Sequence, residues 1–169
     1  MTSAVRVLTG LTAIALGSIG IEQRDPLLLP ACRDVSVVLT ATASEIKRGE
    51  RPEFSVTVSN KTDRPTRILD VRNGRRVDLQ DTYFELFVVR GTTAVEVPVA
   101  ISDPGPVTAA DFVELRPGGH IVISRVSYKR ALERLPPGTY RAFVSFWREP
   151  HDSPATRCLS TAAHFTVKS

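Results

Sequence analysis

Most of this 169-residue chain consists of short stretches in which apolar and polar residues alternate, separated by turn residues. In Phe54–Ser59 every second side chain is apolar, which is the pattern of a strand with one buried face. Further strands are predicted at Val35–Ala43, Thr66–Val71, Thr82–Arg90, Thr93–Ala100, Phe112–Leu115, Ile121–Val126, Thr139–Trp147 and Ser160–Val167. About seven to nine antiparallel strands at this spacing predict an all-β sandwich or barrel.

Turn residues and one helix candidate complete this pattern. Asn73-Gly74 is the strongest hairpin signal of the chain, because this pair tolerates the positive φ angles of a tight turn. Pro98 lacks the backbone N–H that a central strand uses, so its strand is expected at a sheet edge or a bulge. Lys129–Leu135 predicts a short helix, which Pro136 ends. No linker, repeat or change of composition divides residues 35–169, and we expect them to form one domain.

The N-terminus carries the pattern of an export signal. A single cation, Arg6, precedes an uncharged run from Val7 to Ile21. This run is shorter than the roughly 20 residues of a transmembrane helix and fits the apolar region of a signal peptide. Small residues such as Ala13 and Ala15 are typical of cleavage sites, so we expect cleavage between Ala15 and Ile21. The sequence thus predicts a signal peptide (1–20), an extended segment (21–34) and a secreted or periplasmic protein.

Two other fates of the N-terminus stay open. An uncleaved run would be a membrane-anchoring helix, although its three glycines make it a poor one. Leu29-Pro30-Ala31-Cys32 loosely resembles a lipobox, in which Cys32 becomes the lipidated first residue. Charged residues between the apolar run and this motif, and a proline before the small residue, are atypical of a lipobox. Contact with a membrane is expected only through this N-terminal segment.

The basic charge balance does not predict a nucleic-acid partner. The formal net charge is +4, from 22 Lys and Arg against 18 Asp and Glu. Acidic and basic residues are interleaved, as in Lys47–Glu53, which is typical of a solvated surface. The densest basic run, Arg72–Arg76, surrounds the Asn-Gly turn and lacks aromatic residues spaced for base stacking. We therefore expect no nucleic acid among the partners.

No arrangement of residues in the sequence points to catalysis. His120, His151 and His164 form none of the spacings of a metal site, and they are expected to be ordinary strand and loop residues. His151-Asp152-Ser153 contains the residue types of a catalytic triad, but neighbours in sequence cannot reproduce its geometry. We therefore expect a protein that is not an enzyme and that binds no metal or cofactor.

Three segments together resemble bacterial immunoglobulin-like domains. They are a strand with its closing asparagine and two turns in which Pro-Gly follows a leucine: Phe54–Asn60 (FSVTVSN), Glu114–Gly119 (ELRPGG) and Leu135–Tyr140 (LPPGTY). The layout is similar to that of the BsuPI-type proteinase-inhibitor family, and it covers roughly Ser44 to Phe146. The resemblance implies an antiparallel immunoglobulin-like sandwich. Its motifs are turn motifs, so it implies a fold and carries over no functional residue.

The function expected from these observations is binding. Sandwich domains present loops on a rigid scaffold, so we predict an exported interaction domain whose partner is a protein or another cell-envelope component. The candidate contact residues are Trp147, at the end of a predicted strand, and Arg148, His151 and Asp152 in the polar loop that follows. Trp147 also fits a packing role at the edge of the core. A secreted proteinase inhibitor of the BsuPI kind is the alternative, which rests on the resemblance of fold alone.

The two cysteines, Cys32 and Cys158, are predicted to form a disulfide. Export would place both thiols in an oxidising compartment. One cysteine precedes the first strand and the other the last, and in immunoglobulin-like sandwiches these strands often run parallel side by side. Their starts would then lie within the Cα separation of a disulfide, about 4.4–6.8 Å. Lipidation of Cys32 would leave Cys158 unpaired, and two separately buried thiols are the remaining alternative.

Overall fold

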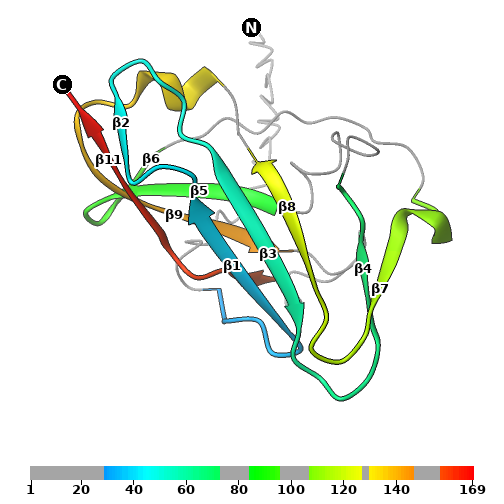
Figure 1. Ribbon diagram of the computed structural model, residues 1–169. Coiled ribbons are helices and arrows are strands. Elements are labelled where there is room, and N and C mark those ends of the chain that lie inside the picture. The colour runs from blue at the N-terminus through cyan, green and yellow to red at the C-terminus, as the bar shows by residue number, and fades with distance from the viewer. Residues whose placement is uncertain (1–28, 73–83, 96–106, 127–129, 147–156) are drawn as a thin grey trace, which may run out of the picture.

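A computed structural model describes residues 29–72, 84–95, 107–126, 130–146 and 157–169 (Figure 1). Their regular structure consists of strands and short 3-10 helices, and no α-helix occurs in these ranges. The prediction of an all-β chain with antiparallel pairing is confirmed. No helix in the same ranges is long and apolar enough to cross a membrane. The predicted signal segment, 1–20, lies outside them.

Two sheets share one core. The three-stranded sheet is antiparallel with the order β1-β3-β8, and it contains β1 (Val35–Ala41), β3 (Phe54–Asn60) and β8 (His120–Val126). The six-stranded sheet has the order β2-β11-β9-β5-β6, with β10 attached to β9. Its strands are β2 (Glu45–Lys47), β5 (Phe84–Arg90), β6 (Thr93–Val95), β9 (Gly138–Phe146), β10 (Cys158–Leu159) and β11 (Ala163–Lys168). In Figure 1, β1, β3 and β8 lie in front of β5 and β9 and cross them.

A two-stranded sheet extends the molecule beyond β8. It pairs β4 (Thr66–Leu69) with β7 (Phe112–Leu115), and β7 follows the short 3-10 helix η2 (Ala109–Asp111). Figure 1 shows this pair to the side of β8. Its buried side chains Ile68, Leu69 and Leu115 belong to the same hydrophobic core as the two larger sheets.

The core forms because the strands bury alternate side chains. On β3, Phe54, Val56 and Val58 are fully buried, and the serine and threonine between them lie on the other face of the strand. The ring of Phe54 contacts the ring of Phe165 on β11, with 5.6 Å between the centroids. This contact joins the two sheets across the core. Burial of a side chain of this kind stabilises the fold by about 1.5–3 kcal/mol.

Asn60, the last residue of β3, ties the end of this strand to two connections. Its side chain is buried, and Nδ2 donates hydrogen bonds to the carbonyl oxygens of Arg64 (2.7 Å) and Leu115 (3.0 Å). Oδ1 accepts hydrogen bonds from the N–H of Thr62 and from the hydroxyls of Thr62 and Thr66. Because both polar atoms of the amide are satisfied, this buried side chain holds the β3–β4 turn against the end of β7.

The connection from β8 to β9 contains the 3-10 helix η3 (Arg130–Arg134). A helix was predicted over Lys129–Leu135, and the structure corrects its type and its extent. Leu132 and Leu135 are buried, and Tyr140 at the start of β9 donates a hydrogen bond from its hydroxyl to the carbonyl oxygen of Pro136 (2.6 Å). These contacts hold the short helix against the core, and the two prolines that follow prevent the helix from continuing.

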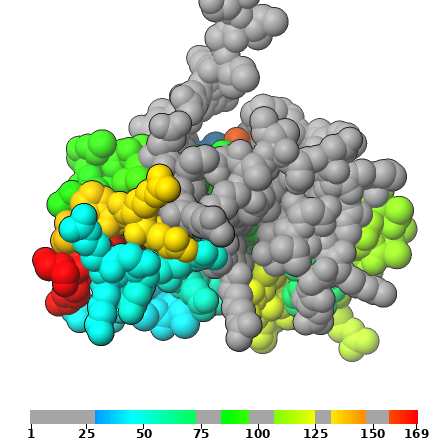
Figure 2. Space-filling view, turned by 90° about the horizontal axis from the view of Figure 1, so that it is seen from above, coloured from blue at the N-terminus to red at the C-terminus, as the bar shows by residue number. Residues whose placement is uncertain are grey.

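Two further contacts fix this corner. Figure 2 shows η3 lying against the segment that joins β2 to β3, and an ion pair links Glu133 of η3 to Arg51 of that segment. Gly138, at the start of β9, has a φ of 153°. A Cβ atom there would lie 2.9 Å from Nε of Arg90, whose guanidinium donates a hydrogen bond to the carbonyl oxygen of Pro137. Glycine fits this position because other residues are strained at this φ, and it also leaves room for the Arg90 side chain.

Two predicted strands are shorter in the structure, and two short strands were not predicted. Val35–Ala43 was predicted as a strand, but β1 ends at Ala41, and the unpredicted strand β2 follows it. Ser160–Val167 was predicted as a strand, but β11 begins only at Ala163, and the unpredicted strand β10 precedes it. Ser160 lies between β10 and β11, where its N–H donates a hydrogen bond to the carbonyl oxygen of Val144 and its hydroxyl accepts one from the N–H of the same residue.

Two further predictions lie partly or wholly outside the described residues. Of the strand predicted over Thr93–Ala100, β6 covers Thr93–Val95 and the remainder falls in the range 96–106. The Asn73-Gly74 turn falls in the range 73–83. Both therefore stay predictions.

Candidate functional site

The structure contains the predicted disulfide between Cys32 and Cys158, with 4.8 Å between the Cα atoms. The predicted reason, that the first and last strands run parallel side by side, is only partly correct. Parallel bridges join Ala31 to Leu159 and Val38 to Thr161, so the first and last parts of the domain do run side by side here. The longer parallel ladder of β11, however, is with β2 and not with β1. Both cysteines are half-buried and pack against the edge of the core.

Residues 158–161 form a seam between the two sheets. Cys158 and Leu159 pair with the end of β9, and the N–H of Ser160 donates to the carbonyl oxygen of Val144 on the same strand. On its other side, the seam donates hydrogen bonds from Leu159 to the carbonyl oxygen of Pro30 (2.9 Å) and from Thr161 to that of Val37 (3.0 Å). The disulfide therefore lies where β9, the N-terminal segment and β1 meet.

Arg157 fixes the seam against the outer face of the six-stranded sheet. Its Nε donates a hydrogen bond to Oγ of Ser145 (3.0 Å), and its guanidinium forms an ion pair with Glu85 on β5. Ser145 is fully buried beneath this contact. The ring of Phe146, the last residue of β9, packs against Phe84 with 5.3 Å between the centroids. Both described ends of the loop 147–156, Phe146 and Arg157, are therefore held by side-chain contacts with the six-stranded sheet.

The predicted contact residues Trp147, Arg148, His151 and Asp152 lie outside the described residues, in the range 147–156. The structure describes the two ends of this loop, Phe146 and Arg157, and nothing between them. The proposed role of the four side chains stays a prediction.

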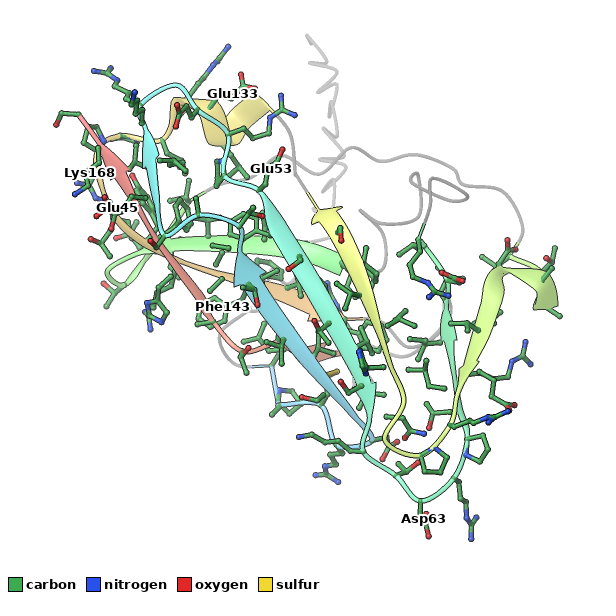
Figure 3. The ribbon with its side chains drawn as sticks, in the orientation of Figure 1. Glu45, Glu53, Asp63, Glu133, Phe143 and Lys168 are labelled. Atoms are coloured by element: carbon green, nitrogen blue, oxygen red, sulfur yellow. A yellow bond between two sulfur atoms is a disulfide. The ribbon has the colours of Figure 1, made fainter. Side chains whose placement is uncertain are left out.

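The outer face of the six-stranded sheet carries a group of side chains that the sequence analysis did not single out. Phe87 on β5 and Phe143 on β9 lie directly opposite each other, and both are half-buried (Phe143 is labelled in Figure 3). The guanidinium of Arg141 lies 5.9 Å from the centroid of the Phe143 ring and donates a hydrogen bond to the carbonyl oxygen of Gly91 (3.0 Å). His164 on β11 is exposed and lies opposite Arg141 in the register of β11 and β9.

We call this group the aromatic face. It consists of the strand residues Glu85, Phe87, Arg141, Phe143 and His164, together with Arg157, which lies across the end of the strands. Val89 and Ser145 share this face and are buried. The charge of Glu85 is matched by Arg157. In the described part of the chain, no acidic side chain pairs with Arg141. The aromatic face therefore combines an apolar centre with an excess of positive charge at its rim.

The outer face of the three-stranded sheet differs in composition. Its described side chains are those of serine, threonine, valine and one histidine, with no aspartate, glutamate, lysine or arginine among them: Ser36, Val38, Thr40, Ser55, Thr57, Ser59, His120, Val122 and Ser124. We call it the hydroxyl face. At its centre Val38, Thr57 and Val122 form one row across the three strands. Val122 is 45% exposed.

The described residues contain no group of three His, Cys, Asp or Glu side chains that could hold a metal ion. His120 and His164 lie in strands, as predicted, on the outer faces of different sheets. His151 falls outside the described residues. Away from the aromatic face, a side-chain hydrogen bond to Asp70 raises the pKa of Arg72 above its ordinary value, so this arginine stays charged.

No family model and no curated protein sequence matches this chain. Among solved structures, a β-glucosidase from Listeria innocua in complex with glucose is 17% identical over 80% of this chain, with a TM-score of 0.37. A β-glucosidase from Erythrobacter marinus is 17% identical over 79% of this chain, with a TM-score of 0.39. The chain spans 16% and 15% of the length of these two enzymes. Likeness at this level carries no argument about fold or activity.

Proposed function

We propose that this protein is an exported, non-catalytic interaction domain with an immunoglobulin-like sandwich fold. Its partner is a protein or another component of the cell envelope. The observation that carries the proposal is the aromatic face, where Phe87 and Phe143 lie opposite each other beside Arg141 on an outer sheet surface.

The sheet topology supports the immunoglobulin-like assignment. The chain begins in one sheet as β1 and then crosses to the other as β2, which runs parallel to the last strand. The hydrogen bond from Tyr140 to the backbone four residues upstream has the form of a tyrosine corner, a feature of the connection that leads into the corresponding strand of such domains. The motifs that carry the family resemblance take part in these connections. Asn60 closes the first motif and donates a hydrogen bond to the carbonyl oxygen of Leu115 in the second, and Tyr140 ends the third.

The composition of the aromatic face supports binding. Interfaces concentrate their energy in aromatic and arginine side chains that are surrounded by a polar rim. Arg141 is held in place by the carbonyl oxygen of Gly91 and by the ring of Phe143, so little of its conformational entropy remains to be lost on binding. The predicted contact loop starts from β9, the strand that carries Arg141 and Phe143.

The test compares one substitution on each outer face. The purified domain is immobilised, exposed to an envelope extract, and the retained proteins are quantified by mass spectrometry. We expect Phe143→Ala to reduce the retained amount of the specific partner at least about tenfold, as for an interface hot spot. Val122→Ala on the hydroxyl face should leave it unchanged. Equal losses in both variants, or no loss in Phe143→Ala, would refute the proposed surface.

The inhibitor alternative remains a prediction of the family resemblance. A panel of serine and metalloproteinases, assayed with the purified domain at micromolar concentration, tests it. Absence of inhibition across the panel would remove this alternative.

A further inference from the structure

The residues just before β1 are part of the fold. The carbonyl oxygen of Pro30 accepts a hydrogen bond from Leu159, and Ala31 forms a parallel bridge with the same residue. Cys32 is bonded to Cys158, and the carbonyl oxygen of Asp34 accepts a hydrogen bond from the N–H of Lys61 (3.0 Å). The segment 30–34 is therefore held by the seam on one side and by the β3–β4 turn on the other.

The two possible processing sites of the N-terminus have different consequences for residues 30–34. Cleavage between Ala15 and Ile21 keeps residues 30–34 intact. Processing at the lipobox-like motif would remove Pro30 and Ala31 and would attach a lipid to the sulfur of Cys32. That sulfur already forms a bond to Cys158, and one sulfur cannot hold both groups.

We propose that the mature chain keeps Pro30 and Ala31, that it is processed upstream of them, and that Cys32 is a disulfide partner and not a lipid acceptor. This inference rests on the export that forms part of the proposed function. It assigns one chemical fate to Cys32 where the sequence left two open.

Processing at Cys32 would damage the fold at the seam. The N–H of Leu159 would lose its acceptor at Pro30, and the half-buried Cys158 would lose its bonding partner. Cys32 would become the lipid-anchored first residue, and the exposed residues Arg33 and Asp34 would follow it directly at the membrane surface.

The disulfide also reports on the completeness of export. Cys158 lies 126 residues after Cys32, so the bond can form only when nearly the whole chain has reached the oxidising side. In this step two thiols lose two protons and two electrons to the disulfide of a thiol oxidase, which becomes a dithiol. A chain that remains in a reducing compartment keeps both thiols free.

The experiment expresses the full chain from Met1 in an exporting bacterium and isolates the exported protein. Its N-terminal peptide and intact mass are measured, and thiols are alkylated with and without prior reduction. We expect an N-terminus upstream of Pro30, no acyl group, and alkylation of Cys32 and Cys158 only after reduction. A chain that begins with acylated Cys32 and has an alkylatable Cys158 would overturn the inference.

Cys158→Ser is the matched control, because lipid attachment acts on the translocated chain and needs no partner thiol. We expect this variant to have the same N-terminus as the wild type and a Cys32 that alkylates without reduction. An acylated Cys32 at the N-terminus of this variant would overturn the part of the inference that places processing upstream of Pro30, because the motif is then cleaved directly before Cys32. A lipid-anchored domain could still bind through the aromatic face, so this failure would differ from failure of the binding proposal. A chain that still carries Met1 with free thiols would contradict export itself.

Discussion

The aromatic face and the hydroxyl face are both outer surfaces of sheets in one small domain, yet they differ in chemistry. The aromatic face sets Phe87 and Phe143 among arginine, glutamate and histidine. The described side chains of the hydroxyl face are those of serine, threonine, valine and one histidine, without aspartate, glutamate, lysine or arginine. A solvated strand face needs polar groups, and most side chains of the hydroxyl face are polar, although Val38 and Val122 lie at its centre. The half-buried phenylalanines of the aromatic face are not needed for solvation, which is why we infer a binding role there.

The two faces also differ in how they are held. The hydroxyl face depends on strand pairing and on the Asn60 network at the end of β3. The aromatic face is fixed in addition by the Arg157–Glu85 ion pair, by the seam and by the disulfide behind it. Extra fixation next to a candidate surface is what preorganised binding requires. Substitutions that affect one face and leave the other unchanged separate these two roles.

Replacing both cysteines by serine should lower the free energy of unfolding by about 4–5 kcal/mol, because the disulfide closes a loop of more than a hundred residues. Urea denaturation measures this loss. Hydrogen exchange should rise first at β10 and beside the aromatic face, while β3 and β8 keep their protection. A loss below about 1 kcal/mol, or equal loosening of both faces, would contradict the role given to the disulfide.

Asn60→Ala should lower the free energy of unfolding by about 2–3 kcal/mol, because the carbonyl oxygens of Arg64 and Leu115 lose a buried donor. Urea denaturation is again the measurement. Ser124→Ala, on the same sheet but exposed, should change stability by less than about 0.5 kcal/mol. If the two variants have equal stability, the Asn60 network does not hold this end of the sheet.

Arg141→Gln should weaken retention of the partner about three- to tenfold and flatten its dependence on salt, because it removes a rim charge that attracts acidic groups. Retention is measured between low and high ionic strength. Lys168→Gln, whose lysine is already paired with Glu45 at the far end of the sheet (Figure 3), is the control and should change neither quantity. An unchanged salt dependence in Arg141→Gln would remove the electrostatic part of the proposal.

Arg157 and Glu85 should couple by about 0.5–1 kcal/mol, since both side chains are only partly exposed and screening by solvent is incomplete. A double-mutant cycle with Arg157→Ala and Glu85→Ala measures the coupling in urea denaturation. A coupling of zero would mean that the ion pair does not contribute to fixing the seam.

Much of the fold could be predicted from the sequence, because strand alternation and turn residues are local signals. Phe54–Ser59 is an example, since its apolar positions are the buried ones. The cysteine pair could be predicted from the expectation of export and from the expected closeness of the first and last strands, although the parallel ladder of β11 is with β2. The short strand β2 could not, because three residues next to a charged turn carry too little alternation to stand out from the turn.

The aromatic face could not be predicted for a different reason. Phe87 and Phe143 are more than fifty residues apart, and only the register of β5 against β9 places them opposite each other. In the sequence each looks like the outward residue of a half-buried strand. The position of Arg141 likewise depends on contacts that appear only in the folded chain, with the carbonyl oxygen of Gly91 and with the ring of Phe143. The two strands are separated by a long stretch of chain, so neither strand alone shows which of its residues will face which residue of the other.

The central claim, that the aromatic face is the contact surface, can be tested most directly by hydroxyl-radical footprinting. The oxidation of Phe87, Phe143 and Val122 is measured in the purified domain and in the intact cell envelope that contains it. We predict that oxidation of both phenylalanines falls in the envelope while oxidation of Val122, 45% exposed on the hydroxyl face, stays the same. Protection of Val122 with unchanged phenylalanines would contradict the account.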